Sequence, residues 1–101
     1  MDDRRNEERV EVSLETVWDG TSSRKCLARI TDLSEGGCFV DTITNVREGE
    51  EIALSGTLGS GDRLDVKGRV AYVMDGFGFG VEFNDIDDAS KATLSKMVQP
   101  S

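Results

Sequence analysis

The sequence contains no histidine, and only two cysteines and one proline occur among its 101 residues. Without histidine, neither a Ser-His or Cys-His nucleophilic pair nor a histidine-ligated metal site can form. Cys26 and Cys38 lack companions for a zinc site, and we expect them to be small buried side chains in a reducing cytoplasm. Paired carboxylates could still perform acid–base chemistry, but abundant acids are more simply a solvated surface. We therefore expect a non-enzymatic protein that uses no metal and no cofactor.

Positive charge and long apolar stretches are also scarce. Twelve Lys and Arg residues face twenty Asp and Glu residues, and the net charge is −8. DNA and RNA binding rests on a basic face that contacts many phosphates, so neither is an expected partner. No apolar run approaches the roughly 20 residues that span a bilayer, and the N-terminus lacks the apolar region of a signal peptide. We expect a single cytoplasmic domain over residues 1–101 with no membrane span.

Apolar and polar residues alternate with a period of two through most of the chain, which is the pattern of half-buried strands. Short polar turns separate these stretches at regular intervals, and Gly68 interrupts the longest of them, where Tyr72 shares the register of Val70 and Met74. Regularly spaced short strands favour a sandwich or barrel, and closure removes exposed edges in a small chain. We predict an all-β fold, a small antiparallel barrel of six or seven strands over residues 9–83. The expected strands cover residues 10–18, 24–31, 38–42, 52–58, 64–74 and 77–83.

The period changes to that of a helix after residue 84. Acids crowd the start of this segment, where the helix dipole favours them, and Asp85 is a candidate N-cap. Apolar residues then recur at helical spacing, and Pro100 ends the pattern. We predict a C-terminal α-helix over residues 85–99 that packs against the barrel.

Two polar segments stand out as candidate binding elements. Residues 32–37 (DLSEGG) lie between apolar stretches; Asp32 and Ser34 could simply cap a turn, whereas Gly36 and Gly37 also allow a ligand to approach the backbone. The second segment is the expected flexible arm at residues 1–8, whose arginines lie near Asp and Glu residues. On composition alone, this arm reads as a disordered, self-neutralising leader.

Together these segments resemble the two signatures of the PilZ domain, the bacterial receptor module for cyclic di-GMP. Residues 5–9 (RNEER) match its Arg-x-x-x-Arg motif, and residues 32–37 match Asp/Asn-x-Ser-x-x-Gly. Arg4 precedes the first motif, as in many relatives, and residues 68–73 and 78–83 are similar to the closing strands of the family. The resemblance extends over nearly the whole chain.

The resemblance implies a stand-alone receptor that binds cyclic di-GMP, changes its N-terminal arm and signals to a protein partner, as a monomer or weak homodimer. Arginine can fork two donors onto a phosphate or guanine, and aspartate can accept from guanine N–H groups. Glu7 and Glu8 would repel a dianionic ligand if they faced it. In an extended arm they can point away, so we expect them to weaken binding without abolishing it. The implied ligand-binding residues are Arg4, Arg5, Arg9, Asp32, Ser34, Gly36 and Gly37, with Tyr72 as a possible stacking platform.

Two other functions are alternatives to a cyclic di-GMP receptor. The first is a PilZ-like adaptor that binds protein and no nucleotide. The second is a barrel for single-stranded nucleic acid, which usually shows several exposed aromatic residues and a basic groove. The chain has one Trp, one Tyr and four Phe residues, mostly in core register, so the second alternative is disfavoured.

Overall fold

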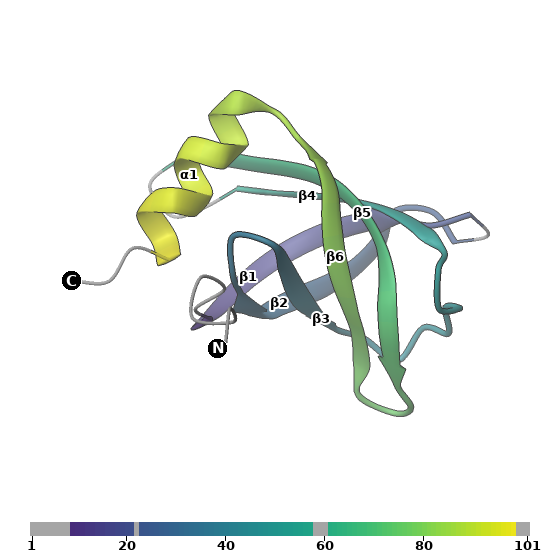
Figure 1. Cartoon of the computed structure of the whole chain (residues 1–101). Coiled ribbons are helices and arrows are strands. Elements are labelled where there is room, and N and C mark those ends of the chain that lie inside the picture. The colour runs from purple at the N-terminus through teal and green to yellow at the C-terminus, as the bar shows by residue number, and fades with distance from the viewer. Residues whose placement is uncertain (1–8, 22, 58–60, 99–101) are drawn as a thin grey trace, which may run out of the picture.

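The computed structural model describes residues 9–21, 23–57 and 61–98; the arm expected at residues 1–8 lies outside them. Within this part of the chain, six antiparallel strands close into a barrel and one helix follows (Figure 1). The predicted all-β class, small barrel and C-terminal helix are confirmed. The elements are β1 (Val10–Asp19), β2 (Cys26–Leu33), β3 (Gly37–Asp41), β4 (Glu51–Thr57), β5 (Arg63–Met74), β6 (Gly78–Ile86) and α1 (Asp88–Val98).

The strands are hydrogen-bonded in the order β1-β2-β3-β6-β5-β4, and β4 returns to β1, where Gly56 lies opposite Thr16. Closure gives each of the six described strands a hydrogen-bonded neighbour on both sides, so none of them is an edge strand, which small β-proteins otherwise have to protect. The order also brings β3 beside β6, although β4 and β5 separate them in the sequence. Residues 34–37, which lead into β3, therefore lie next to the last strand of the barrel.

The core fills the barrel with inward side chains from all six strands. Trp18 and Phe79 are both fully buried and meet edge to face, with ring centroids 5.2 Å apart and an interplanar angle of 78°. Burial of each such large apolar side chain stabilises the fold by about 1.5–3 kcal/mol. Thr16 and Trp18 are both buried, as the period-two alternation over residues 10–18 requires of residues on one face.

The helix begins later than its acid-rich sequence predicts. Strand β6 continues to Ile86, and Asp85 lies within it opposite Lys67 of β5. The expected N-cap at Asp85 is therefore wrong, because the ladder extends through this position. The cap is Asp87 instead, whose Oδ1 accepts a 2.8 Å hydrogen bond from the backbone N–H of Ser90.

Helix α1 packs against strand β5 at one end of the barrel (Figure 1). Leu94 and Val98 are buried there, and the buried hydroxyl of Ser90 accepts a 2.9 Å hydrogen bond from the backbone N–H of Asp65. This contact joins the first turn of the helix to the sheet. Among the residues described, no helix combines the length and apolarity that crossing a membrane requires.

Two β-bulges change which side chains face outward. On β2 the register shifts between Ile30 and Asp32, and on β5 it shifts between Val70 and Tyr72. An extra residue in one strand reverses the alternation of the residues beyond it. Ile30 and Val70 are buried, whereas Asp32 is half-buried and Tyr72 is 38% exposed. The expectation that Tyr72 shares the register of Val70 is therefore wrong.

Candidate functional site

The turn at residues 34–37 is shaped by the side chain of Ser34. This residue is 3% exposed, and its Oγ accepts hydrogen bonds from the backbone N–H groups of Gly36 (3.3 Å) and Gly37 (3.1 Å). Its own N–H donates to the Gly37 carbonyl at 2.8 Å. The hydroxyl is thus engaged within the turn, so its role here is to fix the loop conformation.

Strand β6 holds this turn from the other side. The Gly36 carbonyl accepts a 2.9 Å hydrogen bond from the N–H of Phe83, and Gly37 pairs with Glu82 in the ladder. A Cβ atom at Gly37 would overlap the carbonyl oxygen of Val81. Close packing of β3 against β6 therefore requires glycine at position 37. The missing side chain also permits a ligand to approach the backbone.

Arg9 and Asp32, which belong to different sequence motifs, meet beside the turn. Nη1 of Arg9 donates to Oδ2 of Asp32 at 3.1 Å, and the two side chains are 53% and 34% exposed. Hydrogen bonding to Asp32, followed by hydrogen bonding to Tyr72, raises the pKa of Arg9 above its ordinary value. The guanidinium is consequently held between the ends of β2 and β5 and stays charged.

The second carboxylate oxygen of Asp32 is left without a partner. Oδ1 is buried and accepts no hydrogen bond from the part of the chain that the structure describes. A buried acceptor without a donor is unfavourable by about 1–3 kcal/mol, so such atoms are uncommon unless they serve another purpose. Oδ1 therefore keeps an unused acceptor position beside the ion pair with Arg9.

A cavity of about 200 Å³ opens beside the turn and brings much of the predicted site together. Asp32 joins the site through its ion pair with Arg9. Arg4 and Arg5 lie outside the residues described. The predicted site residues that line the cavity are Arg9, Ser34, Gly36, Gly37 and Tyr72.

The cavity wall also contains residues that the sequence did not single out. Ala71, Gly80 and Glu82 come from β5 and β6, whose pattern indicated only closing strands. Glu82 adds a negative charge to this wall, and its Oε1 lies 4.0 Å from Nε of Arg69. Tyr72 pairs with Gly80 across the two strands. The β5 bulge, which brings Tyr72 outward, has no signal in the alternation of residues.

Cys38 also lines the cavity beside the turn, but its thiol is unreactive. It is 5% exposed, and burial, with the nearby charge of Asp32, raises the pKa of its thiol well above the ordinary value. A thiol that stays protonated is a poor nucleophile and a poor metal ligand. Both cysteines are unpaired, as expected for small side chains in the barrel, although Cys26 is only half-buried.

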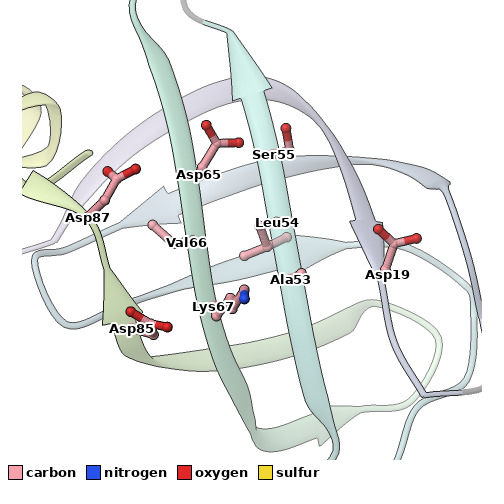
Figure 2. A pocket seen from close by; sticks show the side chains of 9 residues that line it. All are labelled: Asp19, Ala53, Leu54, Ser55, Asp65, Val66, Lys67, Asp85 and Asp87. Carbon is pink, nitrogen blue, oxygen red and sulfur yellow. The ribbon is translucent and has the colours of Figure 1, made fainter. Parts of the chain in front are cut away.

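A second cavity, of about 340 Å³, lies over β4 and β5 (Figure 2). Figure 2 shows four aspartates around Lys67, on β1, on β5, in β6 and just before α1. Such a surface repels a phosphate-containing ligand, because one ammonium group faces four carboxylates. No cluster of metal-ligating side chains occurs among the described residues. The carboxylates are Asp19, Asp65, Asp85 and Asp87.

Three of these carboxylates already serve the fold. Asp87 caps the helix, and Oδ1 of Asp19 accepts a 2.7 Å hydrogen bond from the backbone N–H of Lys25. Asp65 forms an ion pair with Arg63 at 3.1 Å, and hydrogen bonding to that guanidinium lowers the pKa of Asp65. Three of the four carboxylates in this acidic cavity are therefore accounted for by local structure.

Three solved structures share this architecture. The Bacillus subtilis inhibitor of motility, MotI/DgrA, is 16% identical with a TM-score of 0.81; the match covers 96% of this chain and 50% of that one. The PilZ domain of YcgR from Escherichia coli, solved with c-di-GMP, is 16% identical, with a TM-score of 0.71 and coverage of 94% and 88%. The PilZ domain of CeSA from a cellulose-synthesizing bacterium is 15% identical, with a TM-score of 0.63 and coverage of 89% and 93%.

These likenesses define the class of fold, a six-stranded barrel module closed by a C-terminal helix. The present chain spans about half the length of the motility inhibitor. No curated protein matches the sequence significantly. The PilZ domain profile matches residues 3–99, so the chain belongs to the PilZ domain family. The resemblance found in residues 5–9 and 32–37 is confirmed at the level of the family.

Proposed function

We propose that this protein is a cyclic di-GMP receptor that acts on a protein partner, and that the cavity beside residues 34–37 binds the nucleotide. We call the turn at residues 34–37 the motif turn. The observation that carries the proposal is the ion pair of Arg9 with Asp32 beside this turn, with Oδ1 of Asp32 buried and unpaired among the described residues. Family membership supports the proposal, since PilZ domains are ligand-binding and adaptor modules and a similar PilZ domain was solved with c-di-GMP.

The site offers complementary chemistry to a guanine nucleotide. The Arg9 guanidinium can donate two parallel hydrogen bonds to a phosphate or to O6 and N7 of guanine. Oδ1 of Asp32 can accept from the N1–H or N2–H₂ donors of guanine, which adenine lacks at those positions. Gly37 leaves backbone within reach of the ligand, and Tyr72 offers a ring for stacking. Base selectivity would therefore come from Asp32 and charge recognition from Arg9.

The N-terminal arginines complete this proposal. Arg4 and Arg5 would join Arg9 around the phosphates, and residues 1–8 would change their arrangement as the nucleotide binds. Fixing backbone opposes binding by about 1–2 kcal/mol per residue, whereas each charge-assisted hydrogen bond contributes about 1.5–3 kcal/mol. Several arginine contacts can thus offset ordering of a short segment. The rearranged arm and nucleotide would form the surface that a partner recognises.

Calorimetric titration of the full chain with cyclic di-GMP, cyclic di-AMP and GTP tests the proposal. We expect selective binding of cyclic di-GMP and a loss of about 10- to 100-fold for Arg9→Ala, the equivalent of one charge-assisted contact. Arg63→Ala is the matched control, because Arg63 is exposed at the other end of β5 and pairs with Asp65. Equal affinities of the parent and Arg9→Ala would remove Arg9 from the site.

The alternative is a PilZ-like adaptor that binds protein without nucleotide. The observation that favours it is a set of large apolar side chains outside the cavity: Leu27, Ile43 and Phe77 are 81%, 88% and 65% exposed. Exposed apolar groups of this kind are common at protein contacts. An unchanged melting temperature with saturating cyclic di-GMP would favour the adaptor.

A further inference from the structure

Tyr72 belongs to a row of side chains that crosses four neighbouring strands. Asp32 of β2 lies opposite Phe39 of β3, Phe39 lies opposite Gly80 of β6, and Gly80 lies opposite Tyr72 of β5. We call these four residues the outer row. Its two ends are the candidate guanine acceptor and the candidate stacking ring, and Arg9 is hydrogen-bonded at the Asp32 end.

The outer row exists because of the two bulges. Before the bulges, Ile30 pairs with Val40 and Val70 pairs with Val81, and all four side chains point into the core. The next pair in each ladder faces outward by alternation. Because each bulge inserts one residue, Asp32 and Tyr72 occupy these positions in place of the residues directly after Ile30 and Val70. The strands β3 and β6 between them keep an unbroken register. Paired bulges on β2 and β5 thus bring Asp32 and Tyr72 to the same outer face.

Gly80 provides the space for the tyrosine ring. A Cβ atom at Gly80 would overlap Cε2 and Cζ of Tyr72, so the ring lies directly against the backbone of β6. Phe39 flanks the same glycine: its ring is stacked with that of Tyr72, with centroids 6.3 Å apart and an interplanar angle of 29°. Two neighbours therefore restrict the tyrosine, which remains 38% exposed and lines the cavity.

We infer that Phe39 and Gly80 are positioning residues of the nucleotide site, which hold the Tyr72 ring flat on β6 in the orientation that receives the ligand. This inference rests on the proposed function. A ring already fixed before binding loses little rotational freedom when the ligand arrives, which favours affinity. Arg9 lines the same cavity as Tyr72, and Tyr72 contributes to the raised pKa of Arg9. Neither Phe39 nor Gly80 needs to contact the nucleotide.

Substitutions at Phe39 separate ring stacking from simple packing. Phe39→Leu keeps apolar volume but removes the ring, whereas Phe39→Tyr keeps it. By calorimetry with cyclic di-GMP on the full chain, we expect Phe39→Leu and Phe39→Ala to weaken binding by about threefold to tenfold, the entropy of one immobilised side chain. Phe39→Tyr should restore affinity to within about twofold of the parent. Phe77→Ala, which removes an exposed ring from the β5–β6 hairpin, is the control and should leave affinity unchanged.

A second measurement reports the ring directly and does not depend on binding. The chain has one tyrosine, so 3-fluorotyrosine labelling gives a single fluorine resonance in the NMR spectrum. Without ligand, Phe39→Leu and Gly80→Ala should shift or broaden this resonance, because the ring gains alternative orientations, while Phe77→Ala should not. A resonance unchanged in both variants would overturn the positioning of Tyr72.

The two measurements distinguish failure of the inference from failure of the proposed function. If the parent does not bind cyclic di-GMP, the proposed function fails and the positioning role in nucleotide binding fails with it, whatever the fluorine spectrum shows. If the parent binds and Phe39→Leu binds equally well, the proposed function stands and the inference is overturned. Weaker binding by Phe39→Leu, with rescue by Phe39→Tyr and a moved resonance, supports both.

Discussion

Two of the cavities in the described part of the chain have carboxylates at or beside them but use these charges differently. In the acidic cavity of Figure 2, Asp87 caps the helix, Asp65 binds an arginine and Asp19 accepts a backbone N–H. At the motif turn, Asp32 binds Arg9 with one oxygen and leaves the other buried and unpaired among the described residues. A carboxylate that completes a cap or a loop serves the fold. A carboxylate with an open buried acceptor can serve a ligand.

The comparison also explains why the larger cavity is the poorer candidate. Its volume of about 340 Å³ exceeds the 200 Å³ of the cavity beside the turn. Charge, however, distinguishes the two cavities as candidate sites for a nucleotide that carries two phosphates. The acidic cavity has four aspartates against Lys67 and Arg63, whereas the turn has Asp32 and Glu82 against Arg9. The excess of negative charge, which opposes a dianion, is therefore larger in the acidic cavity. The following predictions test this contrast, beginning with the largest expected effect.

Removal of the Asp32 carboxylate should have the largest effect on nucleotide affinity. Asp32→Ala deletes both the open acceptor and the partner of Arg9, which is the loss of about two charge-assisted contacts. We expect cyclic di-GMP affinity to fall by about 100-fold or more in calorimetric titration. Asp85→Ala in the acidic cavity is the matched control and should bind like the parent.

The opposite result would contradict the assignment of nucleotide binding to the cavity beside the turn. If Asp85→Ala weakened binding and Asp32→Ala did not, the nucleotide would bind over β4 and β5. In that case the proposed role of the motif turn would be wrong. Melting temperatures of both variants, measured without nucleotide, show whether each has kept its fold.

Gly37→Ala should lower the stability of the fold, and the site should change only as a consequence of that. The new Cβ would overlap the carbonyl oxygen of Val81, so β3 and β6 would have to separate locally. We expect a loss of about 1–3 kcal/mol in the free energy of unfolding, measured by urea denaturation. An unchanged urea midpoint would show that the strands yield without strain and that Gly37 matters only for ligand approach.

The sequence allowed much of this architecture to be predicted. Period-two alternation found the strands, and the buried position of Trp18 follows from it. The segments at residues 5–9 and 32–37 allowed the family to be recognised, and family membership is confirmed. Arg9, the last residue of the first segment, pairs with Asp32, the first residue of the second. Local patterns were sufficient here because the strands are short, regularly spaced and paired in a closed barrel.

The errors occurred where tertiary contacts override local pattern. Asp85 looks like a helix cap, but the β5–β6 ladder continues through it and passes the cap to Asp87. Tyr72 follows the alternation of the core, but a bulge turns it outward. A bulge depends on the partner strands, so the spacing of residues within β5 cannot reveal it. The need for glycine at position 80 also depends on a partner strand, because the ring of Tyr72 on β5 occupies the space above Gly80 on β6.

Loss of the helix cap should have a moderate effect confined to stability. Asp87→Ala removes the acceptor of the Ser90 N–H and a negative charge at the helix N-terminus. We expect a loss of about 1 kcal/mol in the free energy of unfolding, and a melting temperature about 4–8 °C lower for a chain of this size. Asp88→Ala, a change one position along, should have a smaller effect. Nucleotide affinity should match that of the parent, because Asp87 lies in the acidic cavity; a weakened affinity would couple the two cavities.

The ion pair between Asp65 and Arg63 should have the smallest effect, and that effect should depend on pH. Hydrogen bonds from the guanidinium hold the pKa of Asp65 below its ordinary value of 3.8. A lowered folded-state pKa stabilises the fold above about pH 4, and this contribution is lost as pH falls through the lowered pKa. The pair is exposed, so its contribution should be small and screened by salt.

Urea denaturation of the parent and Asp65→Asn between neutral pH and about pH 2 measures this contribution. We expect the parent to be slightly more stable at neutral pH, and the difference to vanish at the acid end and in about 1 M salt. The contact between β5 and α1 should survive, because the backbone N–H of Asp65 makes it. A difference that persists in acid would mean that the Asp65 side chain acts through packing. In that case packing of the side chains, and not the ion pair, would be the main source of stability in this part of the acidic cavity.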